Sequence, residues 1–460
     1  MPLCWEGEGK MNVGKCIIQP LYFRERNERE QKEYDEQMKN ISALYEDEAE
    51  FLPEKMLGEC VPEQADAVVF PQMIGAVYRS GELIKCIMKP VILMTSQFGT
   101  VEMWDWEIAA YLRENLNMDN VFTPYNVDIG KTILRSIALK KILKNKWKFL
   151  IFQDSPGEGM QANIFKRFYW WEKECVNKIE DYFGTNIVYK SWKEINQKAE
   201  TISDDVAERV WQEKKVPAEG VDRLSAVRAV KLYLAIRDEV EKEGNVLGVG
   251  SNCLNESFLS GTTPCLAWNW LFEYDKILWA CEGDLVTLLS EVLFYYSMKK
   301  PLMMTNIYPF LVGMAALKHE KIDSFPEIED SDNHALGVHC GYFGFLPQSF
   351  SEKWILKPKV LEIVNDHAVM PDAEMSCGPV VLAKIHANMR KITVIEAELK
   401  RYVGYPGSDC RNGAIFHYKN KSGHKIMESL SSHHAIVIQG DVAHLIQQMG
   451  KVFDIEVELF

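Results

Sequence analysis

The chain has 460 residues, of which 47 % are hydrophobic, 26 % charged and 11 % aromatic. This is the composition of an ordinary globular protein with room for about three domains of ~150 residues, and it excludes global disorder. Basic residues number 52 and acidic residues 66, so the formal charge is −14. A negative balance opposes broad attraction to phosphate backbones or anionic lipid, which makes nucleic acid and membrane surfaces poor candidate partners.

The N-terminal segment and one apolar stretch bear on location. Residues 1–8 (MPLCWEGE) lack the basic and apolar regions of a secretory signal. The uncharged stretch 301–317 contains two prolines and Asn306, and it is short for a bilayer span of ~20 residues. Eleven cysteines occur without a Cys-x-x-Cys pair, which argues against zinc ribbons and disulfide oxidoreductases. We therefore expect a cytoplasmic protein with reduced cysteines and no membrane-spanning segment.

The first part of the chain alternates helical and strand patterns. Residues 24–50 are dense in Arg and Glu but carry apolar residues at helical spacing, which predicts a solvated helix with one buried stripe. Strands are expected at 67–70 and 90–94, followed by a helix over 106–116. The alternation is typical of a parallel α/β sheet, which we assign to an N-terminal domain, residues 1–146.

A second α/β unit begins at residue 147. Residues 147–152 contain the apolar run Lys-Phe-Leu-Ile-Phe, which predicts a buried strand. Further strand and helix patterns follow, and we assign them to a central domain, residues 147–330. The expected elements are a helix at 165–183, a strand at 186–190, a helix at 225–242, strands at 246–250 and 276–281, and a helix at 285–297.

The last part of the chain differs in composition and pattern. Charged residues, Pro and Asp/Asn gather at 318–335, which predicts a domain boundary. Strand-type runs at 392–399, 413–418 and 435–439 then dominate, so we expect a β-rich, barrel-like C-terminal domain, residues 331–460. The predicted fold class is therefore two Rossmann-like parallel α/β domains followed by this barrel-like domain. All ten histidines lie at position 319 or later, so any site that uses imidazole draws it from this end of the chain.

One glycine motif matches a dinucleotide-binding pattern, but its sequence context does not. Residues 157–162 (GEGMQA) fit the G-x-G-x-x-A pattern after a predicted strand. The acidic residue that would bind a ribose should end the next strand, yet that strand ends Tyr-Lys-Ser-Trp and Glu194 lies beyond it. We interpret the glycines as an ordinary βα turn. The hydrolase motif G-x-S-x-G and the metalloprotease motif H-E-x-x-H do not occur.

Carboxylates follow two successive strands of the central unit. Glu282 and Asp284 lie where an apolar strand ends and a helix begins, and Glu256 lies in the loop after the preceding strand. The carboxyl edge of a parallel sheet is where α/β proteins collect ligands. A glutamate at the end of an apolar strand needs a cation, a metal or solvent, and a divalent metal is the economical answer. The structural alternative is that Asp284 caps the helix and Glu282 favours its positive end.

These residues also carry a resemblance. The run Cys281–Asp284 (CEGD) after a strand, preceded by Glu256 and followed by Gly337–Gly341 (GVHCG) and Ser432–Ala435 (SHHA), resembles the L-fucose isomerase and L-arabinose isomerase superfamily. The resemblance covers roughly residues 88–455. It implies a sugar isomerase in which a manganese-type ion is held by two acidic residues of the central domain and one or two histidines of the C-terminal domain. It also implies a homo-oligomer, a trimer or hexamer.

The resemblance extends to individual residues. Glu256 matches the first acid, while the second acid is Glu282 in the arabinose-type pattern and Asp284 in the fucose-type pattern. Either member of the final histidine pair matches the near-terminal histidine. The candidate metal ligands implied by the resemblance are Glu256, Glu282, Asp284, His339, His433 and His434.

The expected reaction interconverts an aldose and a ketose through an enediolate, whose negative charge a divalent ion stabilises. Mixed oxygen and imidazole ligands suit Mn²⁺, with Mg²⁺ or Co²⁺ as substitutes. Glu256 and Glu282 are the expected acid and base. Trp268 and Trp270 could stack on a sugar or simply belong to the core. Two alternatives stay open: another metal-enediolate sugar enzyme, an aldolase or epimerase, and a non-catalytic sugar-binding member of the fold.

Overall fold

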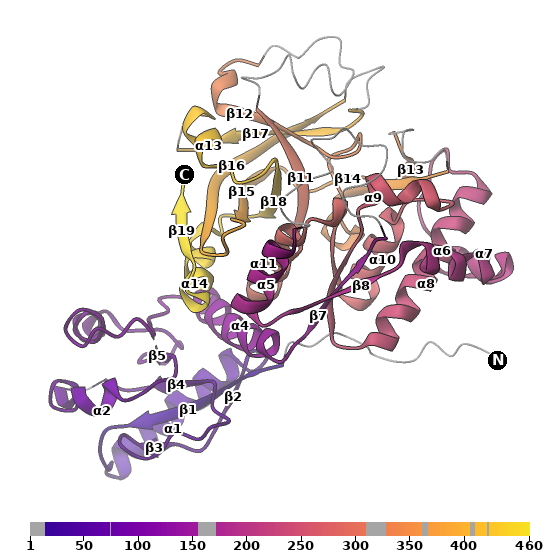
Figure 1. Ribbon diagram of the computed structural model, residues 1–460. Helices are drawn as coiled ribbons and strands as arrows, with labels where there is room; N and C mark the ends of the chain where they lie inside the picture. Colours follow the sequence, from indigo (N-terminus) through magenta and orange to yellow (C-terminus); the bar gives the residue numbers. More distant parts are fainter. Residues whose placement is uncertain are drawn as a thin grey trace.

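The computed structural model describes residues 14–73, 75–154, 172–309, 328–360, 367–404, 410–420 and 423–460. Two parallel α/β sheets are followed by a six-stranded antiparallel barrel, which confirms the predicted fold class (Figure 1). The predicted glycine motif at 157–162 lies outside the described residues.

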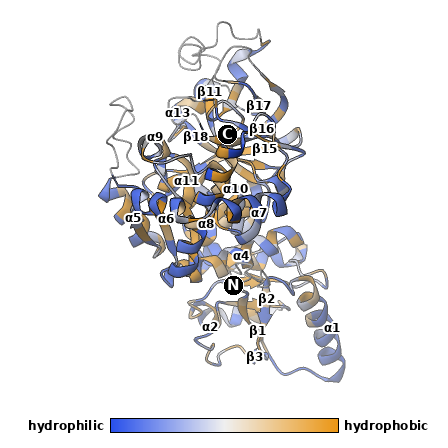
Figure 2. Cartoon of the chain, turned by 90° about the vertical axis from the view of Figure 1, so that its right-hand side faces the viewer, coloured by the Kyte–Doolittle hydropathy of each residue, from blue (hydrophilic) through white to orange (hydrophobic). Residues whose placement is uncertain are grey.

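The first sheet has the strand order β2-β1-β4-β5-β6, with β3 paired to β1. Helix α1 (Glu28–Leu44) begins at a capping box formed by Asn27 and Glu30. It buries Tyr34 and Ile41, and the rest of its surface is largely hydrophilic (Figure 2), as expected for a solvated helix with one buried stripe. The strands are β1 (Cys16–Tyr22), β2 (Ala49–Phe51), β3 (Lys55–Met56), β4 (Ala67–Phe70), β5 (Val91–Leu93) and β6 (Val121–Phe122).

The helices of this first unit include one that the sequence reading missed. The helix expected over 106–116 is present as α3 (Trp106–Ala110), which continues into a wider π-type turn. Helix α4 (Val127–Lys144) was not predicted, and its N-terminus is capped by the side chain of Asn126. It packs against β1 on one side and against α11 and α14 on the other, so it joins the first sheet to the rest of the molecule. A short helix, α2 (Gly81–Lys85), precedes β5 in the chain.

The central sheet has the parallel strand order β10-β9-β7-β8. Its strands are β7 (Lys148–Phe152), β8 (Asn186–Lys190), β9 (Val246–Gly250) and β10 (Leu278–Ala280). A Cβ at Gly248 in β9 would lie 2.6 Å from Leu288 Cδ1, so this glycine permits close packing of α11 on the sheet. The helices are α5 (Lys173–Phe183), α6 (Trp192–Thr201), α7 (Asp204–Lys214), α8 (Arg223–Glu243), α9 (Cys253–Glu256), α10 (Cys265–Asp275) and α11 (Leu285–Met298).

The barrel has the antiparallel order β15-β18-β11-β12-β17-β16 and closes through the pairing of β15 with β16. Strand β11 lies before the boundary expected at residue 331, so part of the apolar stretch 301–317 is a barrel strand. The barrel strands are β11 (Leu302–Pro309), β12 (His334–Val338), β15 (Gly378–Ile385), β16 (Lys391–Val403), β17 (Gly413–Tyr418) and β18 (His434–Gln439). The remaining elements are β13 (Lys353–Pro358), β14 (Val369–Glu374), β19 (Glu456–Leu459), α13 (Gly423–Ser429) and α14 (Ala443–Phe453).

Helix α11 lies between the central sheet and the barrel. It is buried nearly all round because it packs on β9 and β10 and also on β11, β15 and β18. Its N-terminus therefore faces the start of β18, which places the end of β10 close to the first residues of that barrel strand. Among the described residues, no helix combines the length and apolar character that crossing a membrane requires.

Candidate metal centre

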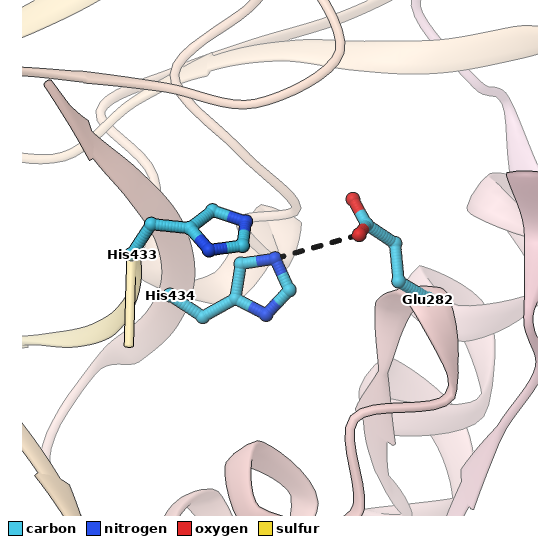
Figure 3. A group of neighbouring side chains, drawn as sticks. All are labelled: Glu282, His433 and His434. Carbon is cyan, nitrogen blue, oxygen red and sulfur yellow. Dashed lines mark ion pairs between the residues drawn. The ribbon is translucent and has the colours of Figure 1, made fainter. Parts of the chain in front are cut away.

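Glu282 sits in a strained turn at the carboxyl edge of the central sheet. The turn Cys281–Gly283 follows β10, and within it Glu282 has φ 58° and ψ 14°. This left-handed conformation is uncommon for a residue with a side chain and costs free energy. The turn leaves the side chain 7 % exposed and directed toward the histidines at the start of β18 (Figure 3). Such strain at a buried carboxylate is typical of a functional site.

Asp284 caps α11 and also holds a histidine. Its carboxylate accepts hydrogen bonds from the Thr287 backbone N–H at 2.9 Å and from the Thr287 hydroxyl at 2.7 Å. Its Oδ2 also accepts from His434 Nδ1 at 2.8 Å and from Lys384 Nζ at 2.5 Å. Burial alone would raise the pKa of Asp284, but Lys384 and His434 bring it well below its ordinary value. Asp284 is therefore an ionised residue that orients His434, in addition to being the helix cap.

Glu282, His433 and His434 form a group that could hold a metal ion. One ligand atom from each lies within 4.8 Å of the others. His434 Nε2 is 3.6 Å from Glu282 Oε2, and the two imidazole rings are 4.1 Å apart between centroids (Figure 3). Because Nδ1 of His434 is hydrogen-bonded to Asp284, Nε2 of His434 is the nitrogen that faces Glu282. A carboxylate that fixes a histidine in this way is the usual arrangement behind a histidine ligand of a metal.

The charges of this group favour a cation between its members. Burial would raise the pKa of Glu282, but His434 and the other two histidines lower it to about 2. Burial and His434 lower the pKa of His433 to about 3, so its imidazole is neutral at pH 7. The pKa of His434 is raised, since Glu282 and Asp284 outweigh the effect of burial. His434 must lose this proton before Nε2 can bind a metal ion.

His339 lies beside the group but outside the set within 4.8 Å. This residue directly follows β12 and is 1 % exposed. Its ring stands edge-on to that of His434, with 6.1 Å between ring centroids. Burial lowers its pKa to about 3, although Glu282 opposes the shift. Within the described part of the chain, neither ring nitrogen has a hydrogen-bond partner. An unsatisfied buried polar group costs about 1–3 kcal/mol, so these nitrogens indicate that something else binds here.

Glu256 reaches the same edge of the sheet. It ends α9, is 1 % exposed, and its Oε1 accepts a hydrogen bond from the Asp154 backbone N–H at 3.0 Å. Asp154 follows β7, and α9 packs against the turn that carries Glu282. The structure thus brings both predicted carboxylates to the carboxyl edge of neighbouring strands. Glu256 does not belong to the closest set of ligand atoms among the described residues.

The sequence reading missed several polar residues of this edge. Lys384 was not singled out, although a lysine inside the apolar strand run GPVVLAKI was a usable signal. Ser251 and Asn252, which follow β9, and Ser257 are also fully buried. Their side-chain polar atoms have no partner in the part of the chain that the structure describes. These hydroxyl and amide groups are available to a polar ligand.

The two predicted stacking tryptophans lie in the hydrophobic core. Trp268 is 0 % exposed and Trp270 is 3 % exposed. Trp270 packs edge-on to Tyr233, with ring centroids 5.1 Å apart. This is the core position that the sequence left open as the alternative to sugar stacking.

A second group on the barrel could also hold a metal ion. Asp330, His334 and His417 each offer a ligand atom within 4.8 Å of the others. His334 and His417 pair across β12 and β17, and His417 Nε2 is 3.9 Å from Asp330 Oδ2. Asp330 is exposed and both histidines are half-buried. The sequence reading assigned these residues no metal-binding role.

Comparison of the sequence with models of known protein families finds no match, and comparison with curated proteins finds none either. The function of the buried group is therefore argued from its own geometry and chemistry.

Proposed function

We propose that the protein is a metal-dependent aldose–ketose isomerase of the L-fucose and L-arabinose isomerase type. The observation that carries the proposal is the buried group in which Glu282 of the central unit meets His433 and His434 of the barrel. One carboxylate and two imidazoles suit Mn²⁺, with Mg²⁺ or Co²⁺ as substitutes. The fold supports the proposal, since the central sheet supplies the carboxylates and the barrel supplies the imidazoles that the sequence resemblance leads us to expect.

The chain's own residues prepare this group for a cation. Glu282 is ionised, His433 is neutral, and Asp284 holds His434 through Nδ1 at 2.8 Å. A divalent ion bound here would act as a Lewis acid toward the carbonyl and hydroxyl oxygens of an open-chain sugar. Burial of Glu282 and His434 keeps water away from the reacting oxygens, which strengthens the electrostatic interactions within the site.

Proton transfer falls to residues around this group. In the proposed reaction Glu256 is the base that moves a proton between C2 and C1, and the Asp154 N–H fixes one of its oxygens. Glu282 is the second carboxylate at the same edge and supports the acid–base step. His339, a neutral imidazole with a pKa near 3, can donate a hydrogen bond to a sugar oxygen. Asn252 offers a buried amide to the sugar hydroxyls.

The proposal is tested with a panel of free aldoses and ketoses in D₂O with added Mn²⁺, followed by NMR. We expect one sugar to give its isomer with deuterium at the carbon that receives the proton. EDTA should remove the activity and Mn²⁺ should restore it. Undiminished turnover by a metal-free preparation would contradict the proposal. Fragments from C–C cleavage would point to an aldolase, an inverted stereocentre to an epimerase, and binding without conversion to a sugar-binding protein.

A further inference from the structure

A buried lysine lies beside the candidate metal centre. Lys359 follows β13 and is 7 % exposed. Within the described residues, its Nζ has one hydrogen-bonding partner, Cys265 Sγ at 3.7 Å, and no carboxylate oxygen lies within 4.0 Å. Lys384, which is also buried, pairs with Asp284, and Lys357 in β13 pairs with Asp372 at 2.8 Å. Since sulfur is a weak acceptor, Lys359 lacks, among the residues that the structure describes, the partner that a buried ammonium needs.

The N-terminus of α10 adds a second source of positive potential at the same point. Cys265, the residue that Lys359 contacts, is the first residue of this eleven-residue helix. The first bond within the helix runs from the Trp268 N–H to the Pro264 carbonyl, and no side chain caps the end. The backbone N–H groups of residues 265–267 therefore have no helical acceptor, and all three residues are buried. An ammonium directed at such an end favours an anion.

Lys359 lies close to the residues of the candidate metal centre. Its ammonium is near enough to His339 to contribute, together with burial, to the lowered pKa of that imidazole. Burial raises the pKa of the Cys253 thiol, which lies at the backbone N–H of Glu282, and Lys359 opposes this shift. Cys253 follows Asn252, whose buried amide nitrogen and oxygen have no partner among the described residues. The ammonium and the helix end that it contacts therefore lie beside the candidate metal centre.

We propose that Lys359 and the first turn of α10 bind an anionic oxygen group of the substrate, so that the preferred sugar carries a phosphate or a carboxylate. This inference rests on the proposed function for the sugar and for the neighbouring metal. A neutral sugar would leave the buried ammonium without a counter-charge, whereas an acidic sugar supplies one. Phosphate and carboxylate share the chemistry that this subsite recognises, namely oxygen acceptors with negative charge.

The subsite is tested on the full chain with inorganic phosphate as the probe, by calorimetry at constant ionic strength. Lys359→Met is the test variant, and Lys353→Met is the matched control, because Lys353 is an exposed residue of β13, the strand that Lys359 follows, and pairs with Glu374. We expect phosphate affinity to fall at least about tenfold in the first variant and to stay unchanged in the second, as for loss of a hydrogen bond to a charged group. Equal affinity in wild type and Lys359→Met, or no phosphate binding by wild type, would overturn the inference.

A second measurement covers folding and separates the two proposals. An aldose phosphate, a uronate and the neutral parent sugar are compared by thermal shift with wild type and Lys359→Met. The subsite is supported if the aldose phosphate, the uronate or both raise the melting temperature of wild type, while the neutral sugar does not and the effect is lost in Lys359→Met. The compound that stabilises the protein then identifies the anion. Stabilisation by the neutral sugar alone would overturn the anion subsite. Mn²⁺ affinity is measured on the same samples. If the protein binds phosphate but not Mn²⁺, the isomerase proposal fails and the anion subsite stands. If it binds Mn²⁺ but not phosphate, only the anion subsite fails.

Discussion

The two groups that could hold a metal ion differ in how the fold prepares them. Glu282, His433 and His434 come from two units of the molecule, and Glu282 and His434 are buried between the central sheet and the barrel, while His433 is half-buried. Asp330, His334 and His417 lie close together on the barrel, and Asp330 is exposed. Both groups place their ligand atoms within 4.8 Å of one another, so this closeness does not show which of them binds a metal ion.

What distinguishes the first group is its surroundings. Asp284 holds Nδ1 of His434, and Lys384 neutralises part of the charge of Asp284. At the barrel group, His334 Nδ1 instead bonds the Asp330 backbone oxygen at 2.8 Å, and the Asp330 carboxylate is within hydrogen-bond distance of Asn333 Nδ2. Burial and the charged carboxylate behind His434 therefore make the first group the stronger candidate metal centre.

The largest effect is expected when a ligand of the buried group is removed. Glu282→Gln keeps the shape of the side chain but loses its charge, so Mn²⁺ affinity should fall more than ~100-fold and turnover should be abolished. His417→Ala, in the barrel group, is the control and should leave both unchanged. The measurements are Mn²⁺ titration by EPR and the NMR assay. Turnover lost in the control but kept in Glu282→Gln would reverse the comparison.

A large effect on turnover alone is expected at Glu256. Glu256→Gln retains a hydrogen-bond acceptor for the Asp154 N–H but cannot accept a proton, so turnover should fall by ~10²–10⁴-fold. Mn²⁺ affinity should change much less than in Glu282→Gln, because Glu256 lies outside the closest set of ligand atoms. Steady-state kinetics and Mn²⁺ titration on the same preparation check both statements. Full activity in this variant would exclude Glu256 as the base.

An intermediate effect is expected at the residue that orients His434. Asp284→Asn can still accept the Thr287 N–H bond, but it loses the charge that holds His434 and Lys384. Replacing such a supporting carboxylate costs ~10–100-fold in metal affinity. We expect wild type to bind Mn²⁺ most tightly, Asp284→Asn less tightly and Glu282→Gln least tightly. An affinity equal to that of wild type would show that the orientation of His434 contributes nothing.

The smallest effect concerns the buried environment rather than the metal. Burial and Asp284 raise the pKa of Glu291, on α11, well above its ordinary value, although backbone N–H groups of Trp279 and Met304 oppose the shift. The folded state then binds a proton that the unfolded state has released, so stability falls as pH rises above the ordinary value of a glutamate. A pKa that is higher by one in the folded state than in the unfolded state lowers the free energy of unfolding at high pH by about 1.4 kcal/mol.

Glu291→Gln has no proton to release, so its melting temperature relative to wild type should rise between pH 5 and pH 8. Circular dichroism melts at both pH values measure the difference. A constant difference across this range would mean that Glu291 titrates like an exposed residue.

Much of the fold followed from periodicity, while the missed elements had weak signals. In strand Lys148–Phe152 the last four residues form a continuous apolar run, which is typical of parallel sheets because both faces are covered. Helix α4 carries buried residues on several sides, so it lacks the amphipathic stripe that identifies a surface helix. Strand β11 lies in an apolar stretch that was weighed and rejected as a membrane span but was not recognised as a barrel strand, because its partner β18 lies far away in sequence.

The candidate site was predicted in part, because only some of its residues carry a signal in the local sequence. Glu282 and Asp284 were found because acidic residues at the end of an apolar strand are costly unless a partner is present. The sequence could not decide between them, since the choice depends on His434, which is 150 residues away in the chain. Lys359 was missed because its lack of a carboxylate partner among the described residues can be recognised only in the folded chain.

The proposed metal centre is tested most directly by X-ray anomalous scattering at the manganese edge from crystals grown with Mn²⁺. We expect a strong peak between Glu282 and Nε2 of His434, and its loss in crystals of the Glu282→Gln variant. A peak at Asp330, His334 and His417 with none beside Glu282 would contradict it.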